Sequence, residues 1–343
     1  MELEPVLSTS GRLLDHLPEL ARRAIRPAVW AYVEAGAGGR LTVSEAEAAW
    51  RSVRFRTRVL RGGGDADLRT TLLGTEVSTP IAIAPTAMQR AVHPTGERGM
   101  AEGAGPDALH VVSSNCGTRF DDLRAPGPWW LQAYLPPDRE LFRPVVEDAV
   151  TAGARAIVLT VDTPHPGTKR GVDEEDWSSV DLSWWRVNYP RADVGDWKTD
   201  LDLDDIGWLR EAAGVPVVVK GVLRGDDAAR CLDAGADAIF VSNHGGRQLD
   251  RAASTASALR EVAAAVGDRT EVYVDGGIRS GADVLAALAL GARGVLVGRP
   301  ALWALGVDGG RGVGRLLAEL TEELRECLEL AGCACPDDAP DLL

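Results

Sequence analysis

The sequence predicts an α/β protein built on a (β/α)8 barrel, the TIM barrel architecture. Three observations support this prediction: eight short apolar runs follow one another along the chain, amphipathic stretches separate most of them, and a Gly-Ala pair introduces three of them. Continuous apolar runs that alternate with amphipathic helices are typical of a parallel sheet covered by helices. Eight such units in 343 residues fit a single closed barrel.

The expected strands occupy the apolar runs 80–84, 109–113, 129–133, 156–160, 216–220, 238–242, 271–275 and 294–298. Helical stretches fill most of the intervals, for example 138–152, 226–234, 255–266 and 281–290. Gly153, Gly235 and Gly291 suit the left-handed position that ends a helix, and their recurrence marks repeated βα units. An open doubly wound sheet, the alternative, requires a glycine-rich turn after its first strand. This chain has Pro85-Thr86-Ala87-Met88 there.

The remaining segments extend the barrel. Residues 1–75 are expected to form a helical extension packed on it, because leucines recur at helical spacing from Leu13 to Leu20. The barrel itself is expected over 76–335, followed by a solvated tail at 336–343. The interval after the fourth strand is far longer than a usual βα connection. We expect 171–200 to form an active-site loop or lid, because its four tryptophans argue against full disorder.

Composition excludes several classes of function. The net charge is −14, which argues against nucleic acid and anionic membranes as partners. Five cysteines form no even framework and indicate a reducing cytoplasm. The Cys333-x-Cys335 pair has no histidine nearby, so no metal site is expected. The acidic N-terminus lacks the apolar region of a signal peptide, and no apolar run approaches the roughly 20 residues that cross a bilayer.

Polar residues follow every expected strand, at the end where a barrel of this kind places its active site. A single polar residue at a strand end could be structural. Polar residues at the ends of all the strands predict that hydrogen-bonding groups line the mouth of the barrel. The strand ends and the turns that follow them carry Ala84, Pro85, Thr86, Ala87, Ser113, Gln132, Tyr134, Thr160, Asp162, Lys220, His244, Arg247, Asp275, Gly276, Gly277, Arg279, Gly298 and Arg299.

The stretch VSNHGGRQLD (241–250) carries the most distinctive chemistry. Its two glycines allow the backbone to turn sharply and to approach a ligand closely. His244 can accept a proton near neutral pH, and Arg247 offers a planar pair of donors that suits a carboxylate. Alone, this motif is better explained as an exposed turn. With the lined mouth around it, it predicts chemistry on a carboxylic acid.

Two further loops predict a phosphate-bearing ligand. DGGIRSGAD (275–283) places two glycines and an arginine between the seventh strand and a helix that begins near Ser280, and GRP (298–300) ends the eighth strand. Glycines, arginines and a helix N-terminus after these two strands form the phosphate site that such barrels often carry.

These motifs, together with PIAIAPTAMQ, LTVDTP, VVKGV, VDGGIRSGADVLAALALGA and VGRP, closely resemble the FMN-dependent 2-hydroxy-acid oxidases and dehydrogenases. That family includes glycolate, lactate and mandelate oxidases. The resemblance extends over about residues 11–335 and implies an FMN-binding barrel that oxidises an L-2-hydroxy acid to a 2-oxo acid. It also implies a homotetramer.

The resemblance assigns roles to individual residues. It implies that His244 is the base, that Asp162 pairs with it, that Tyr134 lies near the reacting hydroxyl, and that Lys220 faces the flavin. His244 would take either the hydroxyl proton as hydride leaves, or the Cα proton to give a carbanion; both mechanisms stay open. The substrate would meet Tyr32, Tyr134, Arg247 and Lys169, with its carboxylate held by Arg247 and Tyr32. FMN would contact Ala84, Pro85, Thr86, Ala87, Ser113, Gln132, Thr160, Lys220, Asp275, Gly276, Gly277, Arg279, Gly298 and Arg299.

Two substrate-side positions depart from the family pattern. Lys169 stands where many members have an arginine, although Arg170 beside it could substitute, and Asn115 stands where many have a larger aromatic. Asn115 leaves volume near the substrate side chain. Lys169 loosens the carboxylate clamp, so affinity has to come from elsewhere, and the tryptophans of 171–200 can supply it. Together these features predict a bulky or aryl substrate. Ala87 stands where a glycine is associated with a monooxygenase relative, so the resemblance favours an oxidase with O2 as electron acceptor. The alternatives are a dehydrogenase that passes electrons to a carrier protein or quinone, a non-catalytic flavin-binding barrel, and a flavin-dependent isomerase.

Overall fold

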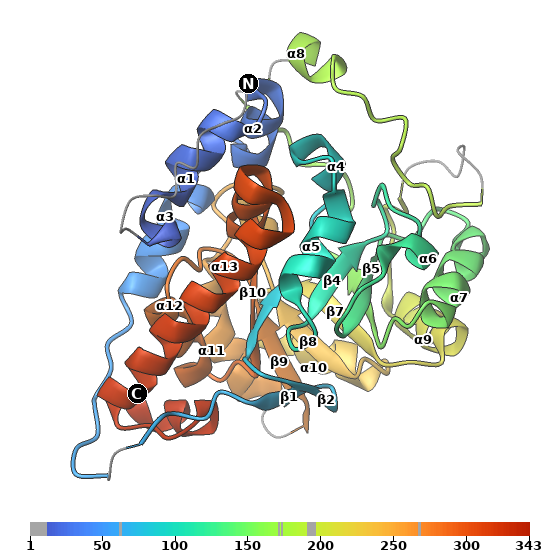
Figure 1. Ribbon diagram of the computed structural model, residues 1–343. Coiled ribbons are helices and arrows are strands. Elements are labelled where there is room, and N and C mark those ends of the chain that lie inside the picture. The colour runs from blue at the N-terminus through green and yellow to red at the C-terminus, as the bar shows by residue number, and fades with distance from the viewer. Residues whose placement is uncertain (1–11, 62–63, 171, 173, 191–196, 267–268) are drawn as a thin grey trace.

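A computed structural model describes residues 12–61, 64–170, 172, 174–190, 197–266 and 269–343. Eight parallel strands close into a barrel in the order β10-β3-β4-β5-β6-β7-β8-β9, surrounded by helices (Figure 1). The predicted fold class is therefore confirmed. The barrel strands are β3 (Ile81–Ile83), β4 (His110–Ser113), β5 (Trp129–Ala133), β6 (Ile157–Thr160), β7 (Val217–Val222), β8 (Ala238–Val241), β9 (Glu271–Val274) and β10 (Gly294–Val297).

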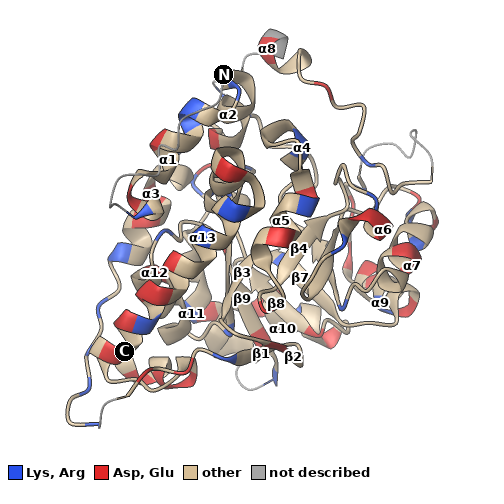
Figure 2. Ribbon diagram, in the orientation of Figure 1, with Lys and Arg blue, Asp and Glu red and all other residues tan. Residues whose placement is uncertain are grey.

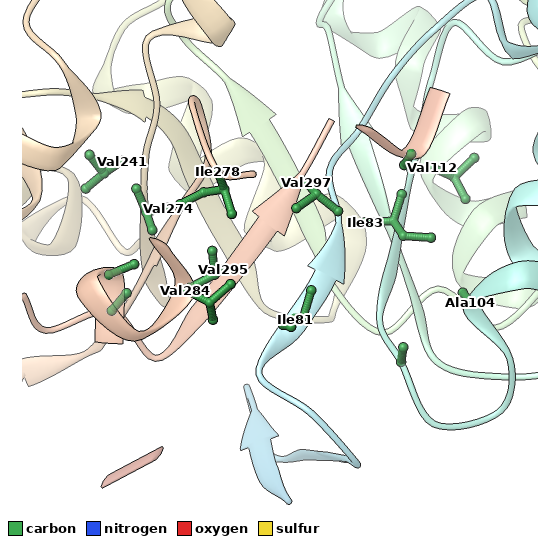
Figure 3. Close-up of a cluster of buried hydrophobic side chains, with 14 of the residues drawn as sticks. Ile81, Ile83, Ala104, Val112, Val241, Val274, Ile278, Val284, Val295 and Val297 are labelled. Carbon is green, nitrogen blue, oxygen red and sulfur yellow. The ribbon is translucent and has the colours of Figure 1, made fainter. Parts of the chain in front are cut away.

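Alternation of side chains along the strands builds two apolar layers. One layer fills the barrel interior, where the Tyr273 ring contacts Trp130 and Phe240 edge to face. The other layer faces the helices. In it, Ile81 and Ile83 of β3 lie in register with Val295 and Val297 of β10 (Figure 3). Because both faces are apolar, the strands read as continuous hydrophobic runs in the sequence.

Helices cover the outer face of the barrel. They are α4 (Gln89–Val92), α5 (Gly96–Ala104), α6 (Phe120–Leu123), α7 (Arg143–Thr151), α9 (Leu203–Ala213), α10 (Gly225–Asp233), α11 (Thr255–Val266), α12 (Gly281–Ala289) and the long α13 (Arg299–Ala331), with a short 3-10 turn η2 (Arg139–Phe142) before α7. Gly153, Gly235 and Gly291 follow α7, α10 and α12 with φ of 104°, 102° and 103°. The prediction that glycine ends these helices in the left-handed region is confirmed.

The N-terminal segment packs on the barrel as three helices, α1 (Leu13–Ala24), α2 (Pro27–Glu34) and α3 (Leu41–Arg51). Helix α1 lies along α13 (Figure 1), and the carboxylate of Glu319 accepts hydrogen bonds from the amides of Leu13 and Leu14. A hairpin, β1 (Thr70–Leu72) and β2 (Thr75–Val77), follows, and Leu72 and Val77 pack against the interior layer. The C-terminal end of helix α2 lies at the mouth of the barrel.

The expectation of a solvated tail is wrong. The last residues form a 3-10 helix, η5 (Pro336–Leu342), which contacts α12. Cys333, Ala339 and Leu342 are buried, and the carbonyl of Leu342 accepts a hydrogen bond from the amide of Arg56. The apolar residues at the end of the chain are therefore part of the folded core.

Charged residues lie mainly on the outer helices and loops. Figure 2 shows acidic and basic residues interspersed along α5, α7 and α13, whereas the barrel strands carry few of either. Within the part of the chain that the structure describes, no helix combines the length and the apolarity needed to cross a membrane.

Candidate active site

A cavity of about 380 Å³ opens at the C-terminal ends of the strands and is lined from all eight of them. Its volume falls in the range of small-molecule sites, about 300–1,000 Å³. Every residue that the sequence proposes for substrate or cofactor lines this cavity. Asp162 is the exception among the proposed site residues, because it is outside the lining and bonds to two residues that belong to it, His244 and Thr163.

One wall carries a row of hydrogen-bonded polar side chains. Ser113 Oγ donates to Gln132 Oε1 at 2.8 Å, and Gln132 Nε2 donates to Thr160 Oγ1 at 3.0 Å. Ser113 and Gln132 are partners in the strand register, so the parallel sheet itself aligns the row. All three side chains are buried. Their mutual bonds fix the orientation of each polar group before any ligand arrives.

Lys220 holds a buried positive charge beside this row. Its Nζ donates to Ser242 Oγ at 2.8 Å and lies 3.3 Å from Asp275 Oδ2. Ser242 Oγ in turn donates to Asp275 Oδ1 at 2.6 Å. A buried charge of this kind persists only when it is paired and hydrogen-bonded, and here both conditions hold.

His244 stands at the centre of the cavity in an unusual backbone conformation. Its φ is 57°, a region that non-glycine residues seldom adopt and that often marks functional sites. The short 3-10 helix η3 (His244–Gly246) turns the chain there, and Ser242 Oγ accepts a hydrogen bond from the His244 amide. The ring lies between two partners, Asp162 Oδ1 at 2.9 Å from Nδ1 and the Tyr134 hydroxyl at 3.4 Å from Nε2.

Asp162 is held as an anion. Burial acts to raise the pKa of Asp162, but the facing His244 charge and hydrogen bond, with Lys220, hold it at about 2. An ionised carboxylate at Nδ1 stabilises a positive charge on the imidazole after it takes a proton. Gly221 makes room for this carboxylate, since a Cβ there would lie 2.6 Å from Asp162 Cβ. Burial and then the Asp162 charge raise the pKa of Tyr134, which keeps its hydroxyl protonated.

A cluster of positive charge lies on the side of α2. Arg247 Nη1 donates to the carbonyls of Tyr32, Val33 and Ala35 at 2.8, 3.2 and 2.9 Å, and its guanidinium lies 4.8 Å from the Tyr32 ring centre. Lys169 Nζ donates to the Gly167 carbonyl at 3.1 Å. Burial and then the Arg247 charge lower the pKa of Lys169 to about 8.

The structure separates the two cations of the HPGTKR stretch. Lys169 lines the cavity, whereas Arg170 is exposed and is not part of the lining. Lys169 is therefore the residue of this pair that can reach a ligand in the cavity.

Two further arginines tie the N-terminal helices to the barrel, Arg299 at the end of α2 and Arg279 at α3. Arg299 donates to the carbonyls of Val33, Ala35 and Gly245 at 3.0, 3.0 and 2.9 Å, and burial followed by the Arg247 charge lowers the pKa of Arg299 to about 10. The Arg279 guanidinium lies 3.1 Å from Glu47 and 5.0 Å from the Trp303 ring centre. The sequence motifs contain these arginines but do not reveal their contacts with the N-terminal helices.

The loops after β9 and β10 form a narrow cradle. Gly276 and Gly277 have φ of 89° and 84°, and a Cβ on Gly277 would lie 2.7 Å from the Ala46 carbonyl oxygen. A Cβ on Gly298 would lie 3.9 Å from Ala84 and Thr86, so the chain is not crowded at this residue, which lines the cavity. Together with Lys220 and the polar row of Ser113, Gln132 and Thr160, these glycines fit a ligand with a planar polar ring and a phosphate.

The helix N-terminus expected at the phosphate is already occupied at α12. The amides of Arg279 and Ser280 donate to Asp283 Oδ2, and the amide of Gly281 donates to Glu323 Oε2 at 2.6 Å. The sequence pattern could not reveal this, because Glu323 belongs to α13. The glycine backbone of the two loops and the start of α13 at Arg299 remain to meet a phosphate.

The described part of the segment between β6 and α9, within residues 161–202, supplies cavity-lining residues that the sequence motifs missed. Trp177, in the short helix α8 (Glu174–Ser178), stacks on Tyr32 with ring centres 4.2 Å apart, and Trp197 stacks on Tyr134 at 5.1 Å. Both tryptophans and Trp185 line the cavity, and α8 contacts α2 near the top of Figure 1. Trp184 is outside the lining and lies under the Arg90 guanidinium. In the sequence, these cavity-lining rings were indicated only by the high tryptophan content of the segment.

Comparison with known proteins identifies the family. Residues 21–342 match the model of the FMN-dependent dehydrogenase family, so the chain belongs to that family and its cofactor is FMN. It is 37% identical to 2-hydroxyacid oxidase 2 of Rattus norvegicus, over 94% of this chain and 95% of the relative. It is 36% identical to an L-lactate oxidase of Nostoc sp., over 92% and 93% of the two chains. A mandelate oxidase variant solved with (S)-mandelic acid superposes with a TM-score of 0.91 at 35% identity, over 96% and 97%.

These relatives define the class of enzyme as well as the fold. The chain is an FMN-dependent oxidoreductase of the 2-hydroxy-acid oxidase group. Since the relatives act on different acids at similar identity, the substrate has to be argued from the cavity itself.

Proposed function

We propose that this enzyme oxidises an L-2-hydroxy acid with a bulky, aryl side chain to the 2-oxo acid, with O2 as electron acceptor. The observation that carries the proposal is the placement of His244 between Asp162 and Tyr134, in one cavity with Arg247 and Lys169. Oxidation of a hydroxy acid requires a group that accepts a proton, and it is helped by cations that bind the carboxylate nearby.

The cofactor would lie along the polar row and reach the glycine loops. Ser113, Gln132 and Thr160 would hydrogen-bond the ring edge, with Ala84, Pro85, Thr86 and Ala87 against it. When bound, FMN supplies the acceptor for two electrons. Lys220 would stabilise negative charge at the ring. Ribityl and phosphate would meet Asp275, Gly276, Gly277, Arg279, Gly298 and Arg299.

The substrate carboxylate would be held on the side of α2. The bonds of Arg247 to backbone carbonyls all start at Nη1, so Nε and Nη2 form the edge that binds a carboxylate through two parallel bonds. Lys169 would add a second charge and Tyr32 a hydroxyl donor. This clamp would place the substrate hydroxyl between Tyr134 and His244.

His244 would then accept a proton at Nε2. Asp162 would hold the Nδ1 proton in place and balance the charge that forms on the ring. Tyr134, protonated because burial raises its pKa, would donate to the substrate hydroxyl oxygen. The proton that His244 accepts is either that of the hydroxyl or that of Cα, and both fit the same position of the ring.

The side chain of the substrate would meet aromatic surface. Trp177, Trp185 and Trp197 line the cavity, and a buried aromatic contact contributes a large apolar stabilisation. Lys169 provides a single point charge, so apolar contact would supply more of the binding free energy than in relatives with a second arginine.

Anaerobic mixing with glycolate, lactate and mandelate tests the proposal. Mandelate should bleach the flavin fastest, and in air the enzyme should form one hydrogen peroxide per 2-oxo acid. A preference for glycolate or lactate would contradict the aryl substrate. Fast bleaching with slow reoxidation by O2 would instead favour a dehydrogenase that uses a carrier protein or quinone, and no bleaching by any 2-hydroxy acid would indicate a non-catalytic barrel.

We further propose that the protein acts in a reducing cytoplasm, as a homotetramer by analogy with its family. All five cysteines are unpaired thiols, which supports the compartment. Light scattering of the purified holoenzyme tests the assembly, and a monomer would contradict it.

A further inference from the structure

One wall of the cavity places a single amide among aromatic rings. Asn115 follows β4, lines the cavity and is only 4% exposed. Trp185 and Trp197 line the same cavity. A polar side chain in such surroundings is unfavourable unless its donors and acceptors are satisfied.

The orientation of this amide follows from its partner. Asn115 Oδ1 accepts a hydrogen bond from Arg186 Nε at 3.0 Å. A guanidinium contains only donors, so the atom that faces Arg186 must be the amide oxygen. The other end of the amide is therefore Nδ2, which is a donor. Within the described part of the chain, Nδ2 donates to no protein acceptor, and it is not sealed from the cavity.

Arg186 is itself held firmly. Its guanidinium lies 5.2 Å from the Trp185 ring centre, 5.4 Å from that of Tyr189 and 5.9 Å from that of Trp197. Such cation–π contacts stabilise a guanidinium against rotation. The Tyr189 hydroxyl is bonded to Ser114 Oγ and to the Tyr134 carbonyl, both at 3.3 Å. The orientation of the Asn115 amide is thus set by a packed cluster.

The position of this amide relates it to the substrate side chain. On the proposed function, the carboxylate meets Arg247 and Lys169, and the hydroxyl meets His244 and Tyr134. On that arrangement we place the far end of the substrate side chain against the wall that contains Asn115, Trp185 and Trp197. Trp197 stacks on Tyr134, so this wall adjoins the reacting centre.

We propose that Asn115, oriented by Arg186, selects a substrate whose side chain carries a hydrogen-bond acceptor, such as a hydroxyl on an aromatic ring. This inference rests on the proposed function and narrows its substrate class. The Nδ2 donor bonds to the ring oxygen, and an apolar group of equal size leaves that donor unpaired. A site built to bond a substrate hydroxyl discriminates against the analogue that lacks it.

The test compares substrates of equal size. We measure kcat/KM for 4-hydroxymandelate against 4-methylmandelate and for 3-hydroxymandelate against 3-methylmandelate. The wild-type enzyme should prefer the hydroxy acid by about tenfold or more in at least one pair, as expected for an unpaired buried donor. In Asn115→Leu, which keeps the size and removes the donor, the ratio should fall to about one.

A binding measurement and a second pair of variants guard against misfolding of Asn115→Leu. Dissociation constants of 4-hydroxy- and 4-methylphenylglyoxylate, measured by perturbation of the flavin absorbance of the holoenzyme, should show the same preference. Arg186→Met should reduce it, because the amide can then rotate, and Arg186→Lys should retain most of it.

Two outcomes would overturn the inference: equal kcat/KM within both wild-type pairs, or a preference that survives both Asn115→Leu and Arg186→Met. The proposed function stands in either case if mandelate is oxidised. If no 2-hydroxy acid reduces the flavin, the proposed function itself fails.

Discussion

The two sides of the cavity are held by different interactions. On the barrel side, Ser113, Gln132 and Thr160 are buried, bonded in a row and fixed by the strand register. On the other side, Trp177 and Trp197 come from the irregular segment between β6 and α9 and are held by stacking on Tyr32 and Tyr134. The barrel side leaves little freedom to change, whereas the second side can vary while the barrel stays intact.

This difference predicts a division of labour. Changes at the strand ends should impair flavin chemistry for every substrate. Changes at the tryptophans of the segment between β6 and α9 should alter the choice of substrate and leave the chemistry intact. The following substitutions test that division.

The largest effect is expected for His244→Ala. The variant should retain FMN, because the polar row of Ser113, Gln132 and Thr160 and the glycine loops after β9 and β10 are unchanged. It lacks the proton acceptor, however. Flavin reduction by the best substrate should slow by about 10²–10⁴-fold, the usual contribution of a general base. Stopped-flow reduction measures it, with the exposed His165→Ala as control. A loss of less than about tenfold would assign the proton transfer to another group.

Sequence reasoning succeeded where position along a strand decides position in space. The eight apolar runs, and the polar residues that follow them, determine a barrel mouth because parallel strands bring their C-terminal ends to one edge. Lys220 and Asp275, for example, lie on different strands and end 3.3 Å apart.

Contacts between distant, irregular segments could not be predicted in this way. The bonds of Arg247 and Arg299 to the end of α2, the capture of the Gly281 amide by Glu323, and the stacking of Trp177 on Tyr32 have no local sequence pattern. The buried C-terminus was missed for the same reason, since its apolar residues are few and their partners lie on α12.

Lys220→Met should shift the flavin potential. Removal of the buried ammonium leaves negative charge on the reduced ring less stabilised. The midpoint potential of the flavin should therefore fall by tens of millivolts. About 30 mV corresponds to 1.4 kcal/mol for a two-electron reduction. Spectroelectrochemical titration measures it, and Lys198→Met, which changes a lysine bonded to Asp205 outside the cavity, is the control. An unchanged potential would place Lys220 away from the ring.

Substrate affinity should depend on pH through Lys169. Its pKa is lowered to about 8 by burial and by Arg247, so the amine is charged below pH 8 and loses its charge as the pH rises through that value. The dissociation constant of phenylglyoxylate should therefore rise above pH 8, by up to about tenfold per pH unit. In Lys169→Arg the guanidinium stays charged and the rise should disappear. The same rise in both proteins would assign the titration to another group.

The smallest effect is expected for Trp185→Ala, and it separates the two sides of the cavity most sharply. Trp185 and Trp184 are adjacent in sequence, but only Trp185 lines the cavity, while Trp184 packs under Arg90. Loss of one aromatic contact worth about 0.5–1.5 kcal/mol should lower kcat/KM for mandelate by about two- to tenfold. The value for lactate should change less, because lactate has no ring to contact Trp185. Trp184→Ala should leave the mandelate-to-lactate ratio unchanged. If Trp184→Ala and Trp185→Ala alter that ratio equally, the segment acts through its folding as a whole, and the proposed contact between Trp185 and the substrate ring is wrong.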